Sequence, residues 1–187
     1  VDALYIASQI VVAVQGLVTR RTSPTEPVII GIGKLNAGTT YNAVAAFAEM
    51  EGTTRTISQE SRDRVRAQVS ETAQSIAALY GGTAEVEWTD FAAALINDPQ
   101  VCREAAEVVD ELLGEGHVVT DRELSLSGDN FAEFELYKPG AYAYLGTGNP
   151  DLPHTMITNH NGGFDVDENA LVTGAGLYVG YTVARLG

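Results

Sequence analysis

The chain has 187 residues, which is enough for one domain or two small ones with a sizeable hydrophobic core. Its 25 acidic residues outnumber 11 basic ones, and the formal net charge of −14 repels phosphate backbones and anionic membranes. Composition therefore argues against nucleic-acid binding and membrane docking. The single cysteine, Cys102, excludes an internal disulfide and suits a reducing cytoplasm, and we expect it to be buried on the apolar face of a helix.

The first predicted element is a helix over residues 2–20, where apolar side chains recur at helical spacing. It begins with Asp2 and carries its basic residues at the far end, so we interpret it as an amphipathic helix and not as a targeting segment. Two prolines in the segment 21–27 end the helix. No stretch of the chain reaches the roughly 18 apolar residues of a membrane span, so we expect no such span.

Two strands, a second helix and a third strand are predicted next in chain order. β-branched residues predict a strand over residues 28–34, and a turn leads to a longer strand over residues 42–56. Ser58 is a favourable N-cap for a helix that ends at Gly81. Residues 84–90 alternate between apolar and polar side chains, which predicts the third strand.

The character of the sequence changes near residue 95, where we place a domain boundary. Asp98 and Pro99 open a helix over residues 99–113, whose apolar stripe must be buried against another element. Shorter elements and a last helix follow: strands at 117–119 and 141–146, a helix over 132–137, and a final helix from about Asp167. This mixture of elements indicates an α+β or α/β fold.

Arg55 and Asn42 are candidates for contacting a substrate carboxylate. A guanidinium at the end of a strand can hold a carboxylate through two hydrogen bonds, which suits recognition of a free amino-acid carboxyl group. The alternative for Arg55 is a solvated surface arginine, which its position alone favours. Asn42 follows a Gly-Thr-Thr-Tyr turn and can donate an amide hydrogen bond to the same substrate, although such an asparagine is more often only a turn residue.

His160 is the candidate metal ligand, because a neutral imidazole in a polar loop can bind a divalent ion. Asp165, Asp167 and Glu168 follow it and can orient the ring. Asp167 and Glu168 also have a structural alternative, since acidic residues stabilise the first turn of a helix. The other two histidines lack a ligand spacing, and we interpret them as surface residues: His117 and His154.

Five motifs resemble the M20 metallopeptidase family, and in particular its amidohydrolase branch of hippurate hydrolases, N-acyl-amino-acid amidohydrolases and carboxypeptidases. They cover essentially the whole chain: VDALYIASQIVVAVQGLVTRR, IGIGKLNAGTTYNAVAAFAEMEGTTRT, SGDNFAEF, PGAYAYLGTGN and HNGGFDVDENALVTGA. The resemblance is specific because all five motifs agree in order and spacing.

This resemblance implies a lid, or dimerisation, domain at residues 1–95, in which two helices cover an antiparallel sheet. Residues 96–187 then correspond to the C-terminal portion of a zinc-peptidase-like α/β catalytic domain. Family members are about twice as long, so the N-terminal half, with the other metal ligands and a glutamate general base, is expected outside these residues. The resemblance also implies a homodimer formed through the lid.

The family's site residues carry over to four positions in this chain. His160 matches a metal ligand, and Arg55 and Asn42 match lid residues that hold the substrate carboxylate. Asp129 stands where the family usually has a glutamate and is one methylene shorter, so it is a candidate residue near the site with a shorter reach. The complete enzyme is expected to hold two divalent metal ions, usually zinc, with manganese, cobalt or nickel as alternatives.

The implied function is hydrolysis of the amide bond of N-acyl amino acids or small peptides with a free carboxylate, by a metal-dependent amidohydrolase or carboxypeptidase. The 187 residues alone are expected to be inactive. The alternative is a non-catalytic remnant that serves in dimerisation or ligand binding, which the altered DNF and HNGG segments favour. A serine or cysteine hydrolase is disfavoured, because the sequence has no nucleophile elbow or Cys–His pairing.

Overall fold

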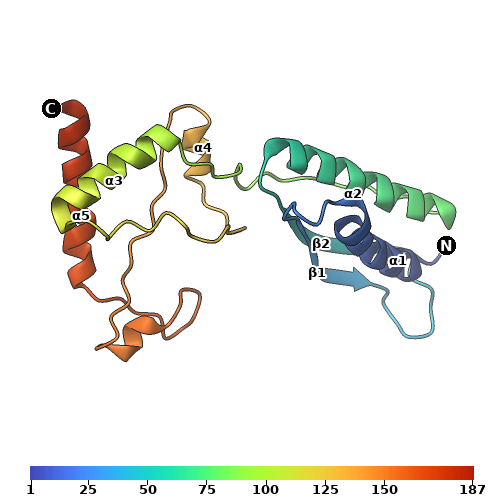
Figure 1. The fold of residues 1–187 in the computed structure, drawn as a ribbon. Coiled ribbons are helices and arrows are strands. Elements are labelled where there is room, and N and C mark those ends of the chain that lie inside the picture. The colour runs from blue at the N-terminus through green and yellow to red at the C-terminus, as the bar shows by residue number, and fades with distance from the viewer. The chain divides into compact units, whose positions relative to one another are not determined.

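The computed structural model describes residues 1–187, which divide into two compact units (Figure 1). The first unit comprises Val1–Leu95 together with Ser125–Ala132, and the second comprises Ile96–Leu124 together with Glu133–Gly187. The sequence predicted one boundary near residue 95; in the structure, residues 125–132 also belong to the first unit. The predicted α+β character is confirmed, since helices accompany one antiparallel sheet.

Helix α1 (Ala3–Gly16) opens the first unit and continues as a π-helical turn over Leu17–Arg21. The Asp2 carboxylate accepts hydrogen bonds from the backbone N–H groups of Leu4 and Tyr5, which lack partners within the helix. The predicted helix over residues 2–20 is therefore confirmed.

The expectation about membrane spans needs a correction. By length and composition alone, the helix over Ala3–Arg21 is long and apolar enough to cross a membrane. A helix that supplies a protein core meets the same criterion, because its buried side must be apolar. One side of this helix is buried in the core of the first unit, through the following residues: Ile6, Ala7, Ile10, Val14 and Leu17.

The sheet of the first unit is an antiparallel hairpin of β1 (Ile29–Ala37) and β2 (Ala48–Arg55). Ile29 lies opposite Arg55 at one end, and Ala37 lies opposite Ala48 beside the connecting loop. β2 is shorter than the predicted strand over residues 42–56, because residues 38–47 form the loop.

A β-bulge interrupts β1 between Ile32 and Lys34 and leaves Gly33 without a partner on β2. Before the bulge Ile32 packs against the core, and after it Leu35 lies opposite Met50, which also packs against the core. The extra residue therefore keeps the apolar positions in phase with the buried face of the sheet.

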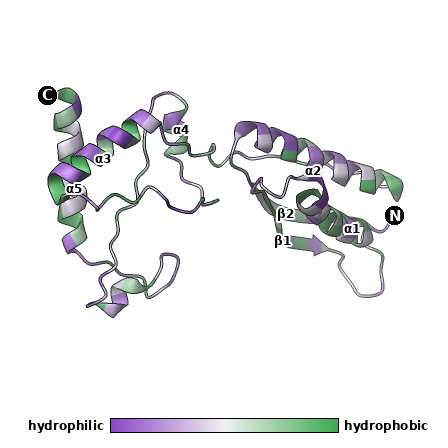
Figure 2. Cartoon of the chain, in the orientation of Figure 1, coloured by the Kyte–Doolittle hydropathy of each residue, from purple (hydrophilic) through white to green (hydrophobic).

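Helix α2 (Gln59–Leu79) packs against α1 and β2 and completes the core of the first unit. Ser58 caps its start through a hydrogen bond from the backbone N–H of Ser61, as predicted. Figure 2 shows that α1 is mostly hydrophobic, whereas α2 alternates between hydrophilic and hydrophobic residues. The buried core combines both helices with β1 and the residue that precedes it: Ile6, Ile10, Val14, Leu17, Val28, Ile30, Val65, Ala73 and Ala77.

The third strand predicted over residues 84–90 is wrong, because the sheet has only two strands. The segment keeps the predicted alternation of half-buried and exposed side chains, and Ala84 and Val86 pack against the core. No neighbouring strand pairs with its backbone. A hydrogen bond of 3.1 Å from the Trp88 indole N–H to Ser70 Oγ attaches the segment to α2 instead.

Two further predicted strands, at residues 117–119 and 141–146, are also wrong. In the second of these segments, the Asn97 side chain takes the place of a strand neighbour. Its Oδ1 accepts a hydrogen bond from the Tyr142 N–H (2.9 Å), and its Nδ2 donates one to the Tyr142 carbonyl (3.0 Å). The backbone N–H and carbonyl of Tyr142 are therefore satisfied by a side chain and not by a sheet.

Helices α3 (Pro99–Leu113) and α5 (Asn169–Leu186) pack against each other in the second unit. The Asp98 carboxylate caps α3, as predicted, and the apolar stripe of α3 is buried at Val101 and Val108. Two shorter helical segments complete the secondary structure: α4 (Ala132–Glu135) and a 3₁₀ turn (Pro153–Met156).

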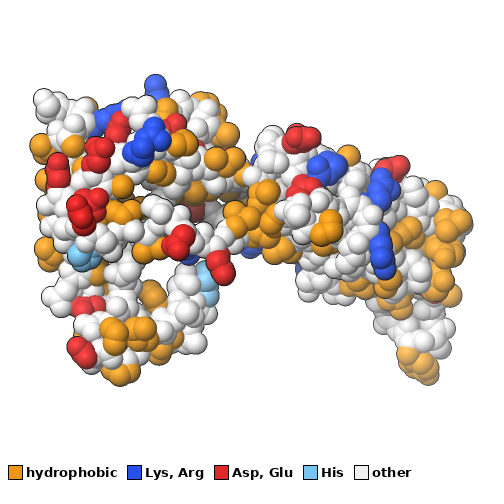
Figure 3. Space-filling model, viewed as in Figure 1, with side chains coloured by type: hydrophobic (Ala, Val, Ile, Leu, Met, Phe, Trp, Pro, Cys, Tyr) orange, Lys and Arg blue, Asp and Glu red, His pale blue; other side chains and the backbone are white.

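Polar side chains reinforce the contact between α3 and α5. Glu104 on α3 accepts a hydrogen bond of 3.2 Å from the Tyr181 hydroxyl and forms an ion pair with Arg185, both on α5. Cys102, also on α3, is only half-buried, so the expectation of a buried cysteine was wrong. Acidic side chains lie on both units in the view of Figure 3, and the net charge of the chain is −14.

The Gly180→Ala substitution should destabilise the packing of α3 on α5. A Cβ atom at position 180 would lie 2.8 Å from Cγ1 of Val108, a buried and branched side chain with little rotamer freedom. We expect this overlap to outweigh the helix-propensity gain of alanine, about 1 kcal/mol, and to lower the free energy of unfolding by about 1–2 kcal/mol.

Gly176→Ala is the matched control on the same helix. Its Cβ would meet the end of the flexible, exposed Leu112 side chain at 3.1 Å, and that side chain can move away. Urea unfolding of both variants tests the prediction, and equal stabilities for the two variants would contradict it.

Candidate functional site

Arg55 lies at the end of β2, and its exposed guanidinium is anchored by one hydrogen bond. Its Nη1 donates to the backbone carbonyl of Leu126 at 2.9 Å. No carboxylate pairs with Arg55, in contrast to four other arginines that form ion pairs: Arg62, Arg64, Arg66 and Arg185. The charge of Arg55 is therefore oriented but not neutralised.

The segment that anchors Arg55 is a compact polar turn in the first unit. Ser125 Oγ accepts a hydrogen bond from the Ser127 N–H (3.1 Å), and the two hydroxyl groups are also hydrogen-bonded. Asp129 accepts a hydrogen bond from the Phe131 N–H at 2.8 Å, so this carboxylate stabilises its own turn. The contact between this segment and Arg55 was not predicted, although closely spaced serines are a recognisable turn signal.

Asn42 lies in the loop at the other end of the hairpin. Its Oδ1 accepts a hydrogen bond from the Thr40 hydroxyl (3.2 Å), and the side chain is exposed. The strand Ala48–Arg55 separates this loop from Arg55 and is about 24 Å long. The structure therefore does not bring Asn42 and Arg55 of one chain onto the same small substrate.

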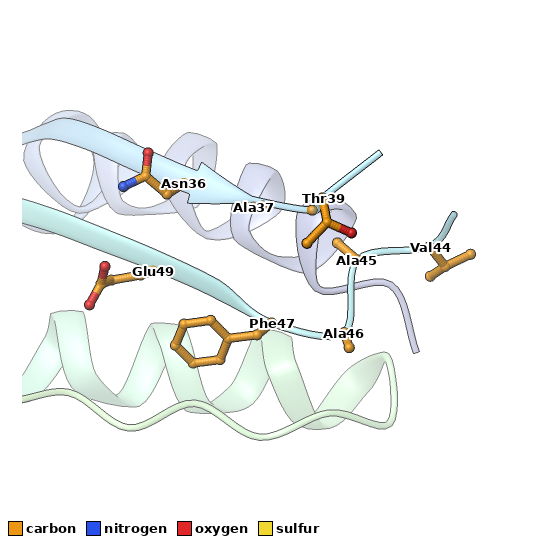
Figure 4. Close-up of a pocket in the computed structure, with 9 residues that line it drawn as sticks. Asn36, Ala37, Thr39, Val44, Ala45, Ala46, Phe47 and Glu49 are labelled. Atoms are coloured by element: carbon orange, nitrogen blue, oxygen red, sulfur yellow. The ribbon is translucent and has the colours of Figure 1, made fainter. Parts of the chain in front are cut away.

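The hairpin loop also borders a pocket of about 440 Å³. Its lining is mainly apolar and comes from both strands and the loop: Asn36, Ala37, Gly38, Thr39, Val44, Ala45, Ala46, Phe47 and Glu49. Figure 4 shows Phe47 and Glu49 on the β2 side and Asn36 on the β1 side of this pocket. Asn42 is not among the residues that line it.

His160 lies exposed in a turn of the second unit and adopts a left-handed backbone conformation, with φ of 63°. Such a conformation is uncommon for residues other than glycine, and it is found more often for asparagine, aspartate and histidine. In the turn that follows, the Asn161 carbonyl accepts a hydrogen bond from the Phe164 N–H at 3.0 Å. The ring of His160 itself is exposed to solvent.

Two of the carboxylates that follow His160, those of Asp165 and Asp167, have other partners, and the Glu168 side chain makes no capping hydrogen bond to α5. Asp165 lies beside His154, with 3.8 Å between Oδ2 and Nε2, and both side chains are exposed. Nowhere in the chain do three or more His, Cys, Asp or Glu residues gather closely enough to hold a metal ion. His160 therefore offers a single nitrogen, and a metal centre built on it would need ligands from outside these residues.

The chain is similar in sequence to known hydrolases. Thermostable carboxypeptidase 1 of Saccharolobus solfataricus is 31% identical over 176 residues, which cover 94% of this chain and 44% of that protein. N-acetylcysteine deacetylase of Bacillus subtilis is 32% identical over 171 residues, which cover 91% of this chain and 43% of that protein. No protein-family model matches the chain.

A solved structure agrees with these sequence relatives. A dinuclear metal-binding peptidase of the M20 family from Bacillus subtilis superposes with a TM-score of 0.81 at 28% identity, covering 100% of this chain and 47% of that chain. The chain belongs to the M20 family. It spans about half the length of the curated relatives that it matches.

Asp167 stabilises the start of α5 in this M20 chain and connects it to Asn149. Its Oδ2 accepts a hydrogen bond from Asn149 Nδ2 (2.7 Å), and its Oδ1 accepts one from the backbone N–H of Asn169 (3.0 Å). The structural alternative for Asp167 is therefore confirmed. The hydrogen bond from Asn149, and then that from Asn169, holds the pKa of the Asp167 carboxyl below its usual value.

We expect the Asp167 contacts to make stability depend on acid pH. Because the folded-state pKa is lowered, this contribution is complete above the unfolded-state pKa, near 3.8, and is lost as the pH falls through the folded-state value. Asp167→Asn should flatten the fall in urea midpoint between about pH 5 and pH 2. Asp151→Asn, an exposed carboxylate in the same unit, is the control; identical pH profiles for wild type and Asp167→Asn would contradict the assignment.

Proposed function

We propose that this chain is the C-terminal portion of a metal-dependent amidohydrolase or carboxypeptidase. Its substrates would be N-acyl amino acids or small peptides with a free carboxylate. The observation that carries the proposal is the match of almost the whole chain to a carboxypeptidase and an N-acetylcysteine deacetylase. Substrates of these two kinds share an amide bond next to an amino acid whose carboxylate is free.

We assign residues 1–95 to a lid domain and residues 96–187 to the C-terminal part of a catalytic domain. The exposed apolar side of α5 supports the second assignment, because a helix in a complete domain buries such a side. No residue of α5 is buried, and six large hydrophobic residues on it are more than half exposed: Leu171, Val172, Tyr178, Val179, Val183 and Leu186. A further part of the catalytic domain would cover them.

His160 is proposed as one ligand of a centre with two divalent metal ions, most simply zinc. The solved relative is a dinuclear metal-binding peptidase, which supports the number of ions. When bound, such ions polarise the scissile carbonyl and activate a water molecule. Because His160 is a single donor, we expect the 187 residues alone to be inactive.

Arg55 is proposed to bind the substrate carboxylate through the N–H groups that it does not donate to Leu126. Asn42 of the same chain is too far away to share that substrate, so we propose that Asn42 serves the site of a second subunit. A homodimer formed through the lid would place it there. We also assign the protein to the cytoplasm, which the lone cysteine and the absence of a possible internal disulfide support.

Assays of the full-length protein test this function. We expect hydrolysis of N-acetyl and N-benzoyl amino acids, loss of activity after chelation, and recovery when zinc, manganese, cobalt or nickel is added. The same N-acyl amino acids with the carboxylate converted to an amide lack the free carboxylate, and they should be poor substrates. A metal-loaded protein that hydrolyses none of these compounds would favour the remnant hypothesis, in which the chain only dimerises or binds ligand.

A further inference from the structure

We propose that the turn formed by Ser125 and Ser127 is a positioning element for Arg55. The turn fixes the Leu126 carbonyl, and this carbonyl in turn orients the guanidinium toward a substrate carboxylate. The inference rests on the proposed function, because it assumes that Arg55 binds that carboxylate. It adds a second segment, 71 positions along the chain from Arg55, to the substrate-binding machinery.

The contact holds Arg55 without using up its charge. Nη1 donates to the Leu126 carbonyl at 2.9 Å, and a guanidinium has five N–H donors, so four remain for a ligand. A carboxylate partner would neutralise the arginine and compete with the substrate. A neutral carbonyl restricts the rotamers of the long side chain and leaves the positive charge available in a protein of net charge −14.

Hydrogen bonds between the residues on either side of Leu126 form the turn. Ser125 Oγ accepts the Ser127 N–H at 3.1 Å and is hydrogen-bonded to the Ser127 hydroxyl. The carbonyl that accepts from Arg55 therefore belongs to a hydrogen-bonded turn of the first unit.

Steady-state kinetics of full-length variants test this role. Ser125→Ala removes the hydroxyl oxygen that makes both turn contacts, and we expect it to raise KM for an N-acyl amino acid about 3- to 10-fold with kcat changed less than about twofold. Ser125→Thr retains the hydroxyl and should restore the wild-type KM. Ser23→Ala is the matched control, because Ser23 forms a similar exposed turn with Thr25 in the same unit.

A double-mutant cycle separates positioning from general loosening of the fold. If the turn acts through Arg55, adding Ser125→Ala to Arg55→Ala should change KM less than twofold. The Ser125→Ala effect should also vanish with a substrate whose carboxylate is replaced by an amide.

Each contrary result has a distinct meaning. An unchanged KM for Ser125→Ala, or an equal increase in the Arg55→Ala background, would overturn the positioning role and leave the proposed function intact. A lower KM would overturn it too, because it would show that Leu126 competes with the substrate. Failure of the proposed function would be seen separately, as a wild-type protein that hydrolyses no N-acyl amino acid.

Discussion

Replacing Arg55 with alanine in the full-length enzyme should raise KM for N-acyl amino acids about 30- to 100-fold, the cost of losing charge-assisted hydrogen bonds to a carboxylate. Because the interaction is made in both the bound substrate and the transition state, kcat should change only a few-fold. The KM of the Arg55→Lys enzyme should lie between those of the wild type and Arg55→Ala, since lysine keeps the charge but loses the planar pair of donors.

Arg21→Ala is the control for this experiment, because Arg21 is also an exposed arginine of the first unit. Circular dichroism should show equal folding of both variants. An Arg55→Ala enzyme with wild-type KM would mean that Arg55 is only a surface arginine.

Replacing His160 with asparagine should reduce kcat/KM of the full-length enzyme at least about 100-fold and remove bound metal. The magnitude follows because losing even an indirect supporting group of a metal ligand costs about 10- to 100-fold. Asparagine is the appropriate replacement, since it tolerates the left-handed backbone at φ of 63° better than alanine does.

Metal content measured by mass spectrometry gives a readout that does not depend on activity. We expect two equivalents per subunit in the wild type and fewer in the His160→Asn enzyme, whereas His154→Asn, which replaces an exposed histidine of the same unit, should retain both. Full metal content and activity in the His160→Asn enzyme would remove this histidine from the site.

Local signals made much of the fold predictable from sequence. Helices α1, α2 and α3 begin at capping residues that the sequence displays directly, namely Asp2, Ser58 and Asp98, so their starts were predicted correctly. The segments 84–90 and 141–146 have the composition of strands, but a strand also needs a neighbour. Composition cannot show that Asn97 or Ser70 supplies the partner instead.

The candidate site was also only partly predictable from the sequence. Residue types and motifs singled out Arg55, Asn42, Asp129 and His160, and whether they bind substrate or metal stays a prediction. The contact of Arg55 with Leu126 joins residues far apart in the chain, and no local pattern indicates it. The separation of Arg55 from Asn42, by contrast, was implicit in the predicted strand over residues 42–56, because the two residues lie near its opposite ends.

The bulge at Gly33 has a consequence for how the hairpin can evolve. An extra residue bends its strand and increases the local twist, so Gly33 sets the direction in which the loop bearing Asn42 projects. Deleting Gly33 would leave Ile32 and Leu35 facing the core, because the two residues would then be two positions apart on a regular strand and would share one face. Deleting one residue can therefore change the direction of the loop that carries Asn42 while the buried face of the hairpin stays the same. Few substitutions in the hairpin could achieve this.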